Sequence, residues 1–104
     1  MTTVINQLRS KIAAKQLEFS KHALDQSILR GITVQELREA IADGEVIEDY
    51  LQDKFGPSCL VFGMTKSRRP IHIHCSYPSR KVVKIITLYQ PDPEQWIDYI
   101  VRRK

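Results

Sequence analysis

The sequence predicts an α+β fold in which N-terminal helices pack on one face of a twisted four-stranded antiparallel sheet. Before residue 44, apolar residues recur at helical spacing; after it, they alternate with polar residues and are often β-branched or aromatic. The connections between the expected strands are short, and short connections join antiparallel neighbours because parallel strands need a long crossover. Helices followed by strands is the order of an α+β domain. With 104 residues, we expect a single domain over 1–104.

Three helices are expected in the first half of the chain. The first lies within residues 1–18, an N-terminal helical segment in which apolar residues recur on one side. The second follows Ser20, a good N-cap, and ends before Gly31. The third follows Thr33, which forms a capping box with Glu36, and it ends before the next glycine.

Four strands are expected in the second half, near residues 46–51, 58–64, 71–77 and 81–89. Pro91-Asp92-Pro93 breaks the last of them. Residues 94–101 fit a short helix or an added edge strand, and the pattern does not choose between them. Residues 97–104 are expected to form a basic tail.

Charge is divided unevenly along the chain. The formal net charge is +4, with −3 over residues 1–53 and +7 over residues 54–104. Such an asymmetry suggests one positive face for an anionic partner and one acidic face. Two ordinary solvated surfaces explain it equally well.

Several classes of protein are disfavoured by composition. Hydrophobic residues make up 42% and charged residues 27% of the chain, which disfavours disorder. The apolar runs are far shorter than the roughly 20 residues that span a bilayer, so we expect no membrane segment. The N-terminus lacks the features of a secretory signal, so we expect a cytoplasmic protein. Cys59 and Cys75 are therefore expected to be reduced and to act as small hydrophobic residues.

Two histidines share one face of the third expected strand. His72 and His74 are two residues apart, whereas Ile71, Ile73 and Cys75 project to the other side. If the apolar set takes the core, both imidazoles lie on the more open face. Arg68 and Arg69 are close in sequence, which suits proton transfer beside a bound phosphate. Histidines on a half-exposed strand are equally often solvated or bonded to a neighbouring backbone group.

A second candidate group lies on the second expected helix. His22, Gln26 and Arg30 recur at intervals of four residues and share a face. His22 is in the first turn, where the positive end of the helix dipole disfavours protonation, and a neutral imidazole suits a general base. Simple surface positions explain these residues as well.

The last expected strand adds two polar side chains. Thr87 and Tyr89 share one face by alternation, and Lys84 is expected on the opposite face. Tyr89 is suited to donate to a phosphate oxygen or to stack on a base, whereas Trp96 is expected to be structural.

No metal site or cofactor is expected. Cys75 projects away from His72 and His74, and the chain has no Cys-x-x-Cys pair. Phosphate-binding glycine loops and nucleophile elbows are also absent from the sequence, which disfavours nucleotide-driven chemistry.

The order of several short segments is similar to that of a bacterial family, domain-of-unknown-function family 4258. The resemblance runs from about residue 19 to residue 96, which we take as the family-like core. Its segments are Phe19-Ser20-Lys21-His22-Ala23, Arg30-Gly31-Ile32-Thr33, Cys59-Leu60-Val61-Phe62-Gly63, Arg69-Pro70-Ile71-His72-Ile73, and Ile86-Thr87-Leu88-Tyr89-Gln90-Pro91-Asp92 with Trp96. The family resembles a branch of the RelE-like and barnase-like ribonuclease fold, and its members often accompany small antitoxins.

The resemblance implies a toxin-type endoribonuclease with a RelE-like fold. Carried over by position, the family's motifs fall on His22, Arg30, His72, Thr87 and Tyr89. One departure matters: many members carry Arg followed by Met where this chain has Gln26-Ser27. Losing that positive charge beside a phosphate would weaken transition-state stabilisation.

Two hypotheses of function follow. The first is metal-independent RNA cleavage by attack of the ribose 2′-hydroxyl, by the toxin of a toxin–antitoxin pair. Its catalytic residues would be His22, Arg30, His72 and Tyr89, and its substrate-binding residues Gln26, Arg68, Arg69, His74 and Thr87. The second is a non-catalytic module of the same fold that binds nucleic acid or a small antitoxin-like protein. The sequence does not indicate an oligomeric state.

Overall fold

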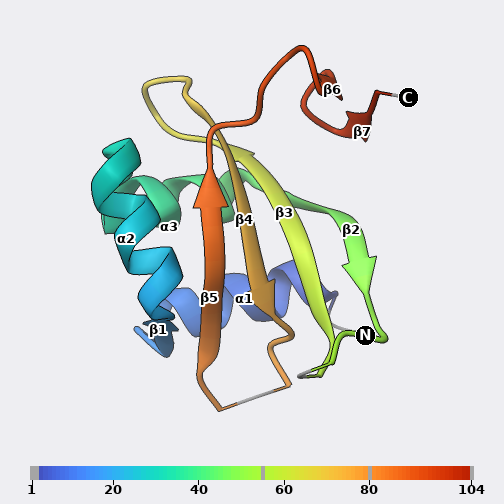
Figure 1. The fold of residues 1–104 in the computed structure, drawn as a ribbon. Coiled ribbons are helices and arrows are strands. Elements are labelled where there is room, and N and C mark those ends of the chain that lie inside the picture. The colour runs from blue at the N-terminus through green and yellow to red at the C-terminus, as the bar shows by residue number, and fades with distance from the viewer. Residues whose placement is uncertain (1–2, 55, 80, 104) are drawn as a thin grey trace.

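A five-stranded mixed sheet and three helices form the body of the protein in a computed structural model that describes residues 3–54, 56–79 and 81–103 (Figure 1). The helices are α1 (Val4–Ala13), α2 (Lys21–Arg30) and α3 (Val34–Asp43). Figure 1 shows α1 and α3 on one face of the sheet and α2 along its β5 side. The α+β class predicted from the sequence is confirmed. None of the described helices is long and apolar enough to cross a membrane.

The sheet has five strands rather than four. Its strands are β1 (Leu17–Phe19), β2 (Glu45–Tyr50), β3 (Ser58–Met64), β4 (Pro70–Ser76) and β5 (Val83–Tyr89). Their spatial order is β1-β5-β4-β3-β2, and β2 to β5 are antiparallel neighbours. Strand β1 pairs parallel to β5, so the prediction of a purely antiparallel sheet is wrong. Three residues are too few to show strand alternation, and the partner of β1 is distant in sequence.

Local sequence signals set the helix boundaries. Ser20 caps α2 by accepting a hydrogen bond from the Ala23 N–H, and Thr33 and Glu36 form the expected capping box of α3. Gly31 ends α2 with a φ of 62°, a left-handed conformation in which glycine carries no steric cost. The first helix ends at Ala13, before β1 begins within the segment expected to be helical.

The core lies between the helices and one face of the sheet. Its side chains come from α1, α3 and the central strands, among them Leu8, Leu37, Val61, Ile73 and Ile85, all fully buried. Cys59 and Cys75 are free, buried and opposite each other in register. At Gly63, an added Cβ would lie 1.8 Å from the Ala40 carbonyl oxygen, so this glycine lets α3 approach β3 closely.

A β-bulge in β5 decides which of its side chains face away from the helices, on the surface that we call the open face. Cys75 pairs with Ile85 but His74 pairs with Thr87, so Ile86 is the extra residue. The bulge interrupts the alternation, and Lys84 and Ile86 line a pocket with His74 on the same face as Thr87 and Tyr89. The expectation that Lys84 lies opposite Thr87 and Tyr89 is therefore wrong.

A second irregularity, between Val46 and Glu48 in β2, shifts the register of that strand against β3. Glu48 pairs with Leu60 and Tyr50 with Ser58. Tyr50 and Leu60 line a second pocket on the open face, and Glu48 forms an ion pair there with Arg102 of the C-terminal segment. The edge strand thus contributes a carboxylate to the open face.

The chain ends in a small hairpin rather than a helix or an added edge strand. Strands β6 (Trp96–Ile97) and β7 (Val101–Arg102) form a separate two-stranded sheet. Figure 1 shows this hairpin beyond the end of β5. Asp98 and Tyr99 form its turn with φ values of 52° and 64°. Much of the expected basic tail therefore has a defined structure.

Candidate functional site

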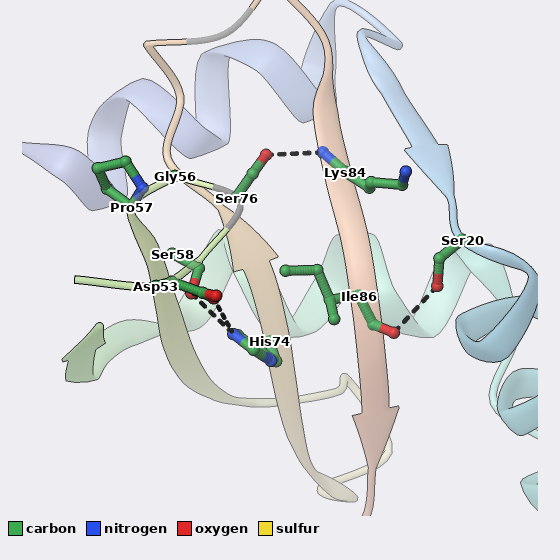
Figure 2. A pocket seen from close by; sticks show the side chains of 9 residues that line it. All are labelled: Ser20, Asp53, Gly56, Pro57, Ser58, His74, Ser76, Lys84 and Ile86. Atoms are coloured by element: carbon green, nitrogen blue, oxygen red, sulfur yellow. Dashed lines mark hydrogen bonds and ion pairs between the residues drawn. The ribbon is translucent and has the colours of Figure 1, made fainter. Parts of the chain in front are cut away.

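Two adjoining pockets on the open face meet at His74 and Asp53. The first has a volume of about 550 Å³, and we call it the lysine pocket (Figure 2); it is lined by Ser20, Asp53, Gly56, Pro57, Ser58, His74, Ser76, Lys84 and Ile86. The second has a volume of about 470 Å³, and we call it the arginine pocket; it is lined by Tyr50, Asp53, Leu60, His74, Thr87, Tyr89 and Arg102. His74 is thus a titratable side chain reachable from both sides.

Ser58 and Asp53 determine which ring nitrogen of His74 carries the hydrogen. The Ser58 hydroxyl donates to Asp53 Oδ2 at 2.7 Å, and His74 Nε2 lies 2.9 Å from the same Ser58 oxygen. An ionised carboxylate only accepts, so the serine hydrogen goes to Asp53 and the serine oxygen accepts from His74 Nε2–H. His74 Nδ1 then carries the lone pair, and it has no hydrogen-bond partner in the part of the chain that the structure describes.

The protonation of His74 follows from its position. Its side chain is 22% exposed, and burial lowers its pKa below the ordinary value of 6.5, with Asp53 opposing the shift. The imidazole is therefore mostly neutral at pH 7. A neutral imidazole with a free Nδ1 lone pair in a pocket is suited to take a proton.

The Ser58–His74–Asp53 group is not a nucleophilic serine triad. In such a triad the carboxylate orients the imidazole nitrogen that faces away from the serine. Here Asp53 contacts Ser58 itself, and its Oδ2 lies 4.0 Å from the same nitrogen of His74 that Ser58 binds. Ser58 is only 1% exposed. The arrangement orients the histidine and does not activate the serine.

His72 shares the open face with His74, but the C-terminal hairpin covers it completely. Its Nε2 lies 2.6 Å from the Tyr99 carbonyl oxygen and its Nδ1 lies 3.2 Å from the Tyr89 hydroxyl. A carbonyl only accepts, so Nε2 holds the hydrogen and Tyr89 donates to Nδ1. The Trp96 ring packs edge-on against the imidazole at 4.5 Å. Burial lowers the pKa of His72, with the Tyr99 carbonyl opposing the shift.

His72 therefore reaches the pockets only through Tyr89. Burial raises the pKa of Tyr89, so this residue, which lines the arginine pocket, stays a neutral phenol. Thr87 lies beside it, paired with His74 across the sheet. The sequence predicts both imidazoles on the more open face, but the hairpin buries His72 and leaves only His74 partly exposed.

Arg102 brings a positive charge to the arginine pocket from the hairpin. Its guanidinium donates to both carboxylate oxygens of Glu48, at 2.8 and 3.1 Å, and Glu48 raises the pKa of Arg102. The same guanidinium lies 4.6 Å from the centre of the Trp96 ring. Arg102 therefore both attaches the hairpin to β2 and lines the arginine pocket.

The expected face of α2 is only partly at the site. Arg30 lies 6.0 Å from the centre of the Tyr89 ring, and its Nε donates to Gln26 at 2.6 Å. Gln26 thus orients Arg30, which stands beside the arginine pocket. His22 is exposed in the first turn, two residues after Ser20 of the lysine pocket. Among the described residues, no hydrogen bond or ring contact joins His22 to His74 or Tyr89.

The two adjacent arginines of the β3–β4 turn are placed apart from His74. Arg69 donates to the carbonyl oxygens of Gly31 and Arg30, both at 2.9 Å, and forms an ion pair with Glu36. Arg69 therefore caps the C-terminus of α2. Arg68 is exposed, with a φ of 70°, and lines a separate hollow of about 410 Å³ on the α3 side of the turn.

Four residues of the site escape sequence reasoning: Asp53, Ser58, Lys84 and Arg102. Asp53 and Ser58 meet because the chain turns between β2 and β3, and Lys84 is brought to the open face by the bulge. A Ser at the start of a strand that pairs with a histidine-bearing strand was the one available signal. Within the described ranges, no group of three or more His, Cys, Asp or Glu side chains is arranged to hold a metal ion.

Comparison with known proteins identifies the family. The model of a domain of unknown function, DUF4258, matches residues 19–90, and the chain belongs to this family. No curated protein and no solved structure matches the chain. The matched segment contains both pockets except Arg102. The hairpin that covers His72 lies outside it.

Proposed function

We propose that this protein is an endoribonuclease that cleaves RNA by attack of the ribose 2′-hydroxyl, without a metal ion. The observation that carries the proposal is His74: a neutral imidazole at the junction of two pockets, with Nε2–H bound by Ser58 and Nδ1 not hydrogen-bonded to any residue that the structure describes. This reaction needs a base at the 2′-hydroxyl, a proton donor at the leaving oxygen and positive charge at the phosphate.

Each step has a candidate side chain. His74 Nδ1 takes the 2′-hydroxyl proton, and the 2′-oxygen forms a bond to phosphorus. The bond from phosphorus to the next 5′-oxygen then breaks, and the Lys84 ammonium gives this oxygen a proton. The products are a 2′,3′-cyclic phosphate and a 5′-hydroxyl, and a proton passed through water from His74 to Lys84 restores both groups.

Charge in the arginine pocket supports phosphate binding. Arg102 lines that pocket, and Arg30 stands over the ring of Tyr89, whose hydroxyl hydrogen is already donated to His72. Arg102 shares its charge with Glu48, so its attraction to phosphate is weaker than that of an unpaired guanidinium. Cationic donors that the fold already holds in place stabilise the charge that develops on the phosphorane oxygens.

The biological setting is proposed by resemblance. The resemblance of the family to RelE-like and barnase-like ribonucleases favours a toxin that acts on cytoplasmic RNA and is inhibited by a small antitoxin-like protein. Many family members resemble this chain but carry an arginine where it has Gln26, so its site has one positive charge fewer. Here Gln26 instead orients Arg30. We therefore expect slow cleavage relative to members that carry the arginine.

The products test the reaction. Purified protein is incubated with end-labelled RNA in excess chelator, and the new ends are identified. We expect 2′,3′-cyclic phosphate and 5′-hydroxyl ends, and no cleavage at a site that carries a single 2′-deoxy substitution. Fragments with 5′-phosphate ends, or cleavage at the deoxy site, would contradict the mechanism.

A non-catalytic RNA-binding module is the second candidate, because Lys84, Arg102 and Arg30 flank the pockets whatever the chemistry. It predicts RNA binding that weakens steeply with salt, as phosphate contacts do. It also predicts intact RNA at high protein concentration. Intact RNA with salt-dependent binding would favour this candidate over the enzyme.

A further inference from the structure

The lysine pocket extends well beyond the atoms that RNA cleavage at His74 requires. It runs along the open face from Ser58 past Ile86 toward Ser20 (Figure 2). Its volume of about 550 Å³ lies within the range of small-molecule sites, ~300–1,000 Å³. The space is therefore large enough for a substantial part of a substrate.

The walls of this pocket differ from those of the arginine pocket. Ile86 and Pro57 supply apolar surface, and among the described residues that line the pocket the only aromatic ring is the imidazole of His74. The half-buried Ile86 side chain is available only because the β5 bulge turns it to the open face. An apolar wall beside a proton-transfer group suits the flat face of a ring.

The polar groups of the pocket are few and mostly committed. Ser20 Oγ donates to the Ile86 carbonyl at 3.0 Å and accepts from the Ala23 N–H. Ser76 Oγ accepts from the Lys84 backbone N–H at 2.9 Å, which leaves its own hydrogen to donate. Figure 2 shows the Lys84 side chain at the side of the pocket nearer Ser20. The described part of the pocket thus offers the Ser76 hydroxyl as a donor and the Lys84 ammonium as a cation beside an apolar wall.

We propose that the lysine pocket is a nucleoside subsite that holds the leaving nucleoside, the one whose 5′-oxygen departs. This inference rests on the proposed function, because it is the position of Lys84 at the leaving oxygen that directs that nucleoside into this pocket. The base lies against Ile86 and Pro57, and the Ser76 hydroxyl donates to an acceptor on its edge. The upstream nucleotide and the scissile phosphate extend from His74 into the arginine pocket.

Two uncleavable probes separate this inference from the proposed function. One is 2′-deoxyuridine 3′-monophosphate, which ends at the phosphate. The other is 2′-deoxyuridylyl-(3′→5′)-adenosine, which adds the leaving nucleoside. Dissociation constants and backbone amide shifts are measured by NMR titration on the full chain. We expect the adenosine to tighten binding about 5- to 10-fold, as burial of one ring face against aliphatic side chains allows. Amide shifts should appear at Ile86 and Ser76.

Variants locate the gain. Ile86→Ala should remove the advantage of the longer probe and leave binding of the monophosphate unchanged. Ile28→Ala, at an exposed position on α2 outside both pockets, is the matched control and should keep the advantage. Should Ile86→Ala fail to fold, Ser76→Ala with the same two probes replaces it.

The outcomes are distinct. If the monophosphate binds at His74 but the adenosine adds nothing, or if the gain survives in Ile86→Ala, the subsite is refuted and the proposed function stands. If neither probe binds at millimolar concentration, both are refuted. A gain confined to the wild type and the Ile28→Ala control supports the subsite.

Discussion

Trp96 is the residue on which the covering of His72 chiefly depends. Its side chain is 3% exposed and its ring packs on the His72 imidazole. The hairpin is also held by the hydrogen bond from His72 Nε2 to the Tyr99 carbonyl and by the ion pair between Arg102 and Glu48, in which the arginine side chain is 62% exposed. At that exposure an ion pair contributes only ~0–1 kcal/mol. Replacing a buried tryptophan by alanine typically costs ~3–5 kcal/mol.

We predict that Trp96→Ala opens the hairpin locally. If the loss falls on hairpin closure, ~3–5 kcal/mol raises the open fraction by about 100-fold or more, since each 1.4 kcal/mol is a factor of ten. Arg102→Ala should raise it by no more than about fivefold. The assay is the rate of carbethoxylation of His72 by diethyl pyrocarbonate, followed by peptide mass spectrometry.

Two controls make the assay specific. Ile97→Ala alters the neighbouring hairpin residue, which is 42% exposed, and should leave the rate near that of the wild type. The thiols of Cys59 and Cys75 lie in the main core and should stay unreactive in Trp96→Ala. Reactive thiols would show global unfolding instead. Protected thiols with an unchanged His72 rate in Trp96→Ala would refute the reasoning.

Three further predictions follow from the same contacts. Ser58→Ala removes a buried hydroxyl that joins Asp53 to His74, so it should lower stability by ~1–3 kcal/mol in urea denaturation and slow RNA cleavage; a rate equal to that of the wild type would show that Ser58 does not orient the base. Gly63→Ala places a Cβ 1.8 Å from the Ala40 carbonyl oxygen and should cost at least ~1–3 kcal/mol, whereas an unchanged melting temperature would contradict the close packing of α3 on β3. Folding lowers the pKa of His72 and His74, so near pH 6.5 the unfolded chain binds more protons at these two residues than the folded chain does. Stability is therefore highest above pH 6.5 and falls as pH drops from there through the folded pKa values; urea midpoints that stay constant between pH 7 and pH 5 would contradict this.

Much of the fold was predictable because its signals are local. The caps at Ser20 and Thr33 and the alternation in β3 and β4 depend only on neighbouring residues, and these elements form where expected. Strand β1 was missed because its pairing with β5 depends on residues far along the chain. The bulge at Ile86 was missed for a related reason: strict alternation is the only register that a single strand reveals.

The candidate site was predictable only in part. The face shared by His72 and His74 follows from strand geometry, yet their exposure depends on where the last ten residues fold back. Arg69 is suited in sequence to bind phosphate, but the end of α2 offers it two carbonyl oxygens first. A charged side chain in a sequence does not reveal which buried acceptors it will satisfy. For this reason the sequence identifies the strands that carry the site but not the role of each side chain on them.

The most direct test of the proposed chemistry is the single-turnover rate of RNA cleavage in excess chelator by three proteins: the wild type, His74→Ala and His22→Ala. Loss of a general base costs about 10²- to 10⁴-fold. The account predicts a loss of that size in His74→Ala only, with the wild-type rate retained by His22→Ala. A folded His74→Ala variant that cleaves RNA at the wild-type rate would contradict it.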